Sequence, residues 1–153
     1  MTAVTLGASG FITARSSLGA DLSLIAVGAT IVLLTTGVVL ARRRHYDAHR
    51  WVQTSAVALN ALLVVIWMIV SLVRYFLPGL PGSLSERGHA LAAVHAATGA
   101  VGVTLGVFVV IAAGRLAGRG QSVARYKPLM RAAYVVYLAA FALGVALYVV
   151  TYG

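Results

Sequence analysis

Residues 22–41 read LSLIAVGATIVLLTTGVVLA, a stretch of twenty residues without a charged side chain, and the basic block Arg42-Arg43-Arg44 follows it directly. An α-helix needs about 20 consecutive apolar residues to cross the hydrocarbon core of a bilayer. Three further long apolar runs occupy about residues 51–77, 88–113 and 128–152. The chain is therefore predicted to be an all-α integral membrane protein, a bundle of four spanning helices.

Residues that favour helix ends stand at the borders of these runs. Asp21 comes just before the first run and is expected to serve as its N-cap. Pro78-Gly79 closes the second run, and Pro128 suits the first turn of the fourth. Between Pro78 and Arg87 the chain is expected to form a turn-rich loop.

The composition also separates this chain from soluble proteins. Of its 153 residues, 61% are hydrophobic and 10% are charged, whereas a soluble domain carries roughly 25% charged residues. Four helices of about 25 residues leave little chain for anything else. We therefore expect residues 1–153 to form a single transmembrane domain.

The basic residues predict how the helices are oriented. Short connections favour an up-down-up-down arrangement. The two connections on one side carry nine lysine and arginine residues, against three on the other side. The nine are Arg42, Arg43, Arg44, Arg50, Arg115, Arg119, Arg125, Lys127 and Arg131; the three are Arg15, Arg74 and Arg87. Positive charge stays in the cytoplasm, so both termini are expected outside (N-out/C-out).

The same placement of charge explains the net charge of +9. The basic residues flank the apolar runs instead of lining one soluble face, so a nucleic-acid partner is not expected. The expected surroundings are a lipid bilayer and the subunits of a membrane protein complex.

The sequence lacks the residues that several classes of chemistry require. The chain has no cysteine, which excludes disulfides, thiolate metal sites and covalent c-type haem. Its acidic residues are Asp21, Asp47 and Glu86, all at span ends or in loops, and no common catalytic motif is present. We therefore predict that the chain is not an enzyme. A small transporter or channel is also disfavoured, because a proton-coupled transporter usually needs a buried acid.

His95 is the first candidate for a cofactor ligand. It lies seven residues inside the third run, or roughly 10 Å along a helix, and an ionisable group at that depth is a functional-site hypothesis. It could bind haem or a metal, or donate to a quinone; the alternative is a neutral imidazole hydrogen-bonded to a neighbouring helix. His89 lies on another face of the same helix. His49 and His95 are roughly 20 Å or more apart in depth, so one haem held by both is not expected, whereas single or shared ligation stays open.

His45 and His49 form a second candidate site. Their spacing of four residues stacks them on one face if the stretch is helical, and two neutral imidazoles so placed can bind a metal such as copper. The alternative is a basic interfacial segment.

Small and polar residues inside the spans predict helix contacts. Gly102 and Gly106 form a small-xxx-small pattern, for which packing inside this bundle is favoured over an interface with another subunit. Asn60 is expected to hydrogen-bond to another helix.

Three stretches resemble the small bacterial four-span membrane proteins typified by CtaM, a maturation factor for haem-copper cytochrome oxidases. The first is Asp47-Ala48-His49-Arg50-x-Val52, the second is His95 followed by Gly102 and Gly106, and the third is residues 144–148, GVALY. The likeness spans roughly residues 42–152. It departs at Tyr126, where that family usually has a histidine, so any metal or haem site formed with His49 would be incomplete here.

This resemblance implies a multi-pass protein of the bacterial inner membrane in a respiratory setting. The leading hypothesis is a non-catalytic accessory subunit or assembly factor of a respiratory or other electron-transfer complex. The alternative is an electron-transfer protein that binds haem b or copper through His95, with His49 or His89 assisting.

Overall fold

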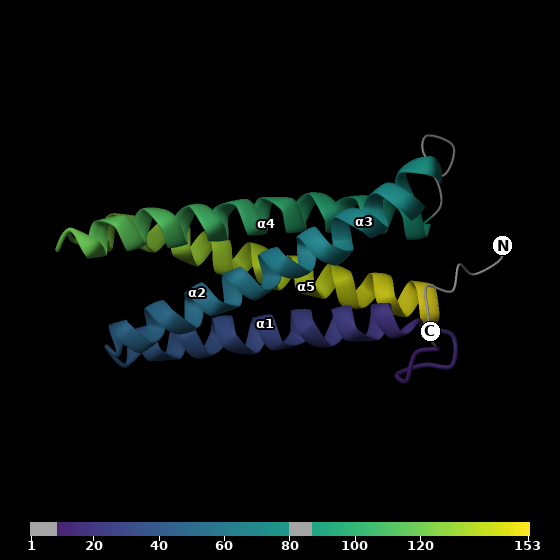
Figure 1. Ribbon diagram of the computed structural model, residues 1–153, viewed down its shortest axis with the longest axis horizontal. Coiled ribbons are helices and arrows are strands. Elements are labelled where there is room, and N and C mark those ends of the chain that lie inside the picture. The colour runs from purple at the N-terminus through teal and green to yellow at the C-terminus, as the bar shows by residue number, and fades with distance from the viewer. Residues whose placement is uncertain (1–8, 80–86) are drawn as a thin grey trace.

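The structure is a computed structural model, which describes residues 9–79 and 87–153. Four long helices account for most of these residues (Figure 1). They are α1 (Leu18–Arg42), α2 (Tyr46–Leu63) with its continuation, α4 (Arg87–Gly118) and α5 (Lys127–Tyr152). Each is long and apolar enough to cross a membrane, which confirms the predicted all-α four-helix membrane bundle. The connection at residues 80–86, including Glu86, lies outside the described residues.

The helices are arranged as two antiparallel hairpins. α1 packs along α2, and α4 packs along α5, while the hairpins touch each other less, through α1 with α5 and α2 with α4. Figure 1 shows the α1–α2 turn and the α4–α5 connection apart at one end, with the start of α1 and the end of α5 close together at the other. The up-down-up-down order is confirmed, and the two basic connections share one end.

The first helix starts earlier than expected, and its cap is a different residue. Ser17 is the N-cap, and its side chain accepts a hydrogen bond from the Ala20 amide. The expectation that Asp21 would cap this helix is wrong. Asp21 is the fourth residue of α1 and is fully buried. A serine oxygen is as good a cap as a carboxylate, so the sequence alone did not separate the two.

The second span is continuous but not uniformly α-helical. After Leu63 it passes through the π-helical segments η1 (Val64–Met68) and η2 (Leu72–Phe76), joined by α3 (Ile69–Ser71), and ends in the 3-10 turn η3 (Leu77–Gly79). In η1 the Trp67 ring lies directly on the backbone of Gly19, where an added Cβ would come within 2.0 Å of it. A π turn inside an α-helix often marks a functional position.

Most large apolar side chains face outward along the spans. Val32 is 65% exposed, Val65 61% and Val135 62%, while the core is a small cluster of Leu34, Ala56 and Tyr137. A soluble protein rarely shows so much contiguous apolar surface, whereas in a bilayer it contacts lipid chains. The chain is therefore a multi-pass membrane protein.

Candidate functional site

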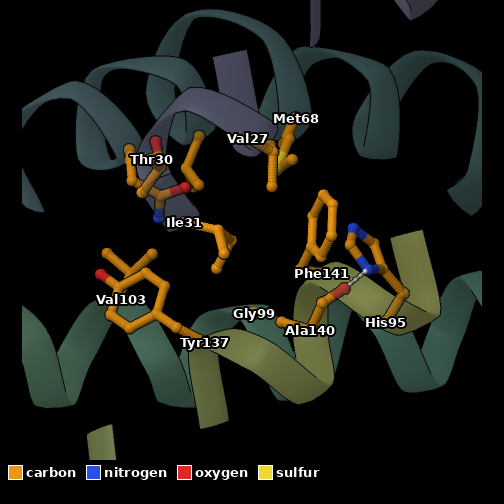
Figure 2. Close-up of a pocket in the computed structure, with 12 residues that line it drawn as sticks. Val27, Thr30, Ile31, Met68, His95, Gly99, Val103, Tyr137, Ala140 and Phe141 are labelled. Carbon is orange, nitrogen blue, oxygen red and sulfur yellow. Dashed lines mark hydrogen bonds between the residues drawn. The ribbon is translucent and has the colours of Figure 1, made fainter. Parts of the chain in front are cut away.

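A small cavity lies near the middle of the bundle, where the four spans meet (Figure 2). Each span contributes one polar side chain to its lining: Thr30 from α1, Asn60 from α2, His95 from α4 and Tyr137 from α5. The remaining lining is apolar or glycine. The volume is about 30 Å³, enough for a water molecule, which needs roughly 10–15 Å³ of this kind of space.

His95 is held in one orientation by the neighbouring helix. Its Nδ1 lies 3.0 Å from the carbonyl oxygen of Ala140 on α5, and Figure 2 shows this hydrogen bond at the end of the cavity away from Tyr137. A carbonyl oxygen only accepts, so Nδ1 carries the proton and a neutral ring keeps a free lone pair on Nε2. The ring also packs on Gly144, where a Cβ would stand 3.0 Å from its Cε1 atom. The alternative that was left open for His95, a hydrogen bond to a neighbouring helix, is thus present, and it leaves Nε2 free for a ligand.

A haem site needs an oriented histidine and enough space, and this site provides only the oriented histidine. A histidine that donates through one ring nitrogen to a carbonyl is oriented as metal-ligating histidines usually are. The space beside it is the limit, because pockets for ligands of drug size measure roughly 300–1,000 Å³ and this cavity measures about 30 Å³. A haem b therefore does not fit between these helices in this arrangement.

Tyr137 and Asn60 form the polar centre of the cavity. The Tyr137 hydroxyl is buried and lacks a hydrogen-bond partner among the described residues, although the Asn60 side chain is near enough to interact with it. The expected hydrogen bond from Asn60 to another helix therefore stays a prediction, because the two side chains are close but no bond of standard geometry joins them. The hydroxyl lies against Gly106, where a Cβ would come within 2.7 Å. Gly102 and Gly106 thus pack inside the bundle, as predicted.

The second candidate pair lies near the basic end of the α1–α2 hairpin. His45 is the N-cap of α2, and His49 follows one turn later. Nδ1 of His49 donates to the carbonyl oxygen of Gly37 at 2.7 Å. No group of three or more potential metal-ligating side chains (His, Cys, Asp or Glu) occurs within residues 9–79 and 87–153, so the pair lacks the third ligand that would complete a copper site.

Distances along the helices keep the predicted site residues apart. His49 is eleven residues from Asn60 on the same helix, which places it about 16 Å from the cavity. His89 lies in the first turn of α4, six residues before His95. Tyr126 precedes α5 and packs beside Phe108 and beneath the Arg125 guanidinium. His49 and Tyr126 belong to the two basic ends that diverge in Figure 1.

Sequence reasoning missed a third polar cluster, at the opposite end of the bundle. One carboxylate oxygen of Asp21 accepts from the amides of Phe11 and Ile12 at 2.6 and 2.8 Å, and the other accepts from the Tyr148 hydroxyl at 2.5 Å. Asp21 is buried, although the sequence placed all acids at span ends or in loops and offered no buried acid. Its burial is possible because three donors replace water around the carboxylate. The Asp21–Tyr148 hydrogen bond also ties α1 to α5. Its partners are 127 residues apart, so no local pattern could reveal it.

Comparison with known proteins gives no assignment: no protein-family model, curated protein or solved structure matches the chain.

Proposed function

We propose that the chain is a non-catalytic membrane subunit or assembly factor that associates with other membrane helices of a respiratory or other electron-transfer complex. The respiratory setting rests on the likeness to the CtaM-type proteins. The need for partner helices rests on the outward surface of the α4–α5 hairpin, which is the observation that carries the proposal.

Small residues recur on that surface at helical spacing. On α4 the exposed positions include Ala97, Ala100 and Thr104, and on α5 they include Ala139, Ala142 and Ala146. Without a hydrophobic drive between helices in lipid, close approach at small residues is a main source of association. Larger apolar side chains share this surface, among them Val94, Val101 and Phe108. The exposed apolar side chains of α1 and α2 include Leu22, Ile25, Val32, Leu59, Leu62 and Ile66.

Co-purification from native membranes tests this proposal. A tagged chain, isolated in mild detergent, is expected to carry a defined set of other membrane subunits, whose identities name the complex. Ala97→Phe on α4 is expected to reduce their recovery, because the larger ring prevents close approach. The matched control, Ile25→Phe on α1, is expected to leave recovery unchanged. Isolation of the wild-type chain alone would count against the proposal.

An alternative proposal is direct haem or metal binding at His95, favoured by the free lone pair that the Ala140 hydrogen bond leaves on Nε2. Because the cavity is small, the hairpins would have to separate to admit a haem. A dithionite-reduced minus oxidised spectrum of the purified chain tests it. A b-type band that His95→Gln removes and His89→Gln keeps would support this function, and a spectrum without such a band would refute haem binding.

Transport is the least supported function. Polar groups do occur on all four spans, but the carboxylate of Asp21 already has three donors, and the cavity has room only for water.

A further inference from the structure

The residues before α1 fold into a defined loop, here called the outer loop (Ser9–Ser17). A bridge between Ser9 and Ser17 closes it, and the Gly10 amide donates to the Ser16 carbonyl oxygen at 2.9 Å. Inside the loop, the buried Ser16 hydroxyl donates to the Thr13 carbonyl oxygen at 2.9 Å. These bonds fix the loop at the end of α1 near the C-terminus (Figure 1).

The loop turns back toward the bundle, so that its tip lies level with the first turn of α1. Phe11 and Ile12 donate their amides to Asp21, three residues after the first helical residue Leu18. That is about 4–5 Å inside the helix end. α1 has 25 residues and is about 37 Å long, against a hydrocarbon core of about 30 Å. A centred helix therefore places Asp21, and with it the tip, at the edge of the hydrocarbon core.

The tip presents apolar side chains at that depth. Because the carboxylate holds the two backbone amides, the side chains of Phe11 and Ile12 face outward, and they are 60% and 46% exposed. Leu18 and Leu22, in the first turns of α1, are also exposed, at 37% and 53%. An aromatic and an aliphatic side chain at this level match the interfacial zone, where such groups partition.

Arg15 adds a positive charge on the water side of this tip. Its side chain is exposed and makes one long hydrogen bond, 3.4 Å, to the carbonyl oxygen of Gly153. The carboxylate of Asp21 accepts from two amides and one hydroxyl, none of them from Arg15. The guanidinium is thus placed to meet a lipid phosphate group.

We propose that the outer loop is an interfacial anchor, in which Phe11 and Ile12 insert into the outer leaflet while Arg15 contacts lipid phosphate. The buried Asp21 sets the depth of insertion, because its carboxylate fixes the backbone of Phe11 and Ile12 at the first turn of α1. This role is separate from the proposed association through α4 and α5, because it concerns the loop before α1 and its contact with lipid.

Site-directed spin labelling can measure this depth, since the chain contains no cysteine. A nitroxide at Phe11→Cys or Ile12→Cys, in proteoliposomes, is compared for collision with oxygen, which concentrates in lipid, and with a water-soluble nickel complex. Val32→Cys (65% exposed, mid-span) gives the lipid reference, and exposed Arg119→Cys gives the water reference. The oxygen-to-nickel ratio at positions 11 and 12 is expected to be several-fold above that of Arg119→Cys.

Two further variants test the parts of the anchor. With the label at position 11, Asp21→Ala is expected to lower the ratio and increase label mobility, whereas Tyr148→Phe, which keeps both amide bonds, leaves both nearly unchanged. Arg15→Gln is expected to make the label shallower in vesicles that contain anionic lipid. If Asp21→Ala fails to fold, the ratios measured at Phe11→Cys and Ile12→Cys with Asp21 in place still decide whether the loop inserts.

Ratios at both tip positions equal to that of Arg119→Cys in vesicles would overturn the proposal. Labels that are exposed to nickel in vesicles but protected in the complex isolated from native membranes would overturn it too, because a protein partner would then cover the tip.

Discussion

At the scale of single residues, Arg44 and Gly120 occupy the same place in two equivalent helix ends. Each has a positive φ, 64° for Arg44 and 67° for Gly120. In both, the next amide bonds back five residues, from His45 to Leu40 and from Gln121 to Leu116, the Schellman pattern that favours glycine. Only Arg44 carries the steric cost of this backbone conformation.

Arg44→Gly is therefore expected to stabilise the protein by about 1 kcal/mol, and Gly120→Ala to destabilise it by a similar amount. Denaturation in detergent micelles, followed by circular dichroism, measures both changes. A loss of stability in Arg44→Gly would mean that the arginine side chain contributes more than its backbone strain costs.

Gly10 is a second residue whose size decides the local structure. An added Cβ would come within 2.1 Å of the Ser16 hydroxyl and 2.6 Å of the Asp21 carboxylate. Gly10→Ala is expected to release the outer loop, and trypsin added outside sealed vesicles should then cut after Arg15 faster than in the wild type. Ala14→Ser, an exposed position in the same loop, is the control. Equal cutting of Gly10→Ala and wild type would show that the loop tolerates the methyl group.

At the scale of helices, α1 and α2 are joined by polar side chains that donate to backbone carbonyls. His49 donates to Gly37, and Gln53 donates to the Leu34 carbonyl oxygen at 3.0 Å. The helices approach closely because Gly37 lacks a side chain: an added Cβ would stand 2.5 Å from the Gln53 amide nitrogen. A helical glycine is otherwise unfavourable by about 0.5–1 kcal/mol relative to alanine.

Gly37→Ala is accordingly expected to destabilise the hairpin by about 1–3 kcal/mol through overpacking. Gly28→Ala, in the same helix, meets no atom within 4 Å and is expected to be neutral or slightly stabilising. Unfolding of the two variants side by side measures the difference. If both behave alike, the close contact with Gln53 is not a determinant of packing.

The α4–α5 hairpin depends on a comparable bond from His95 to Ala140. Interhelical hydrogen bonds in membranes contribute about 0.6–2 kcal/mol, so His95→Ala is expected to lower stability by that order even without any cofactor. Thr104→Ala, whose hydroxyl bonds within its own helix to Ala100, is the control. Loss of a cofactor band without loss of stability would point instead to a ligand role for His95.

The four spans could be predicted because each is a long apolar run, a property of consecutive residues. What holds the spans together could not, because the acceptors for His49 and His95 are carbonyl oxygens that every residue has. The Asp21 cluster could not be predicted for the same reason, because two of its donors are backbone amides, which nearly every residue has. Close packing at Gly102 and Gly106 was predictable from their spacing, whereas only the contacts with Val136 and Tyr137 show that the packing is inside the bundle.

At the scale of the whole molecule, the Asp21–Tyr148 bond and the Arg15–Gly153 contact place the start of α1 and the end of α5 at one end. The Arg42–Arg44 block and the basic α4–α5 connection lie at the other. The count of nine lysine and arginine residues against three predicts that the basic end lies in the cytoplasm. In that orientation the proposed interfacial anchor is expected to meet the outer leaflet.

Single cysteines in the cysteine-free chain test this orientation. Ser122 lies in the α4–α5 connection and Thr151 near the end of α5, and both are exposed. A membrane-impermeant maleimide added outside intact cells is expected to label Thr151→Cys, and to label Ser122→Cys only after the membrane is opened. Val32→Cys, facing lipid in mid-span, should stay unlabelled in both states. The reverse pattern would place the basic connections outside. Phe11, Ile12 and Arg15 would then face the cytoplasmic leaflet, which is rich in anionic lipids.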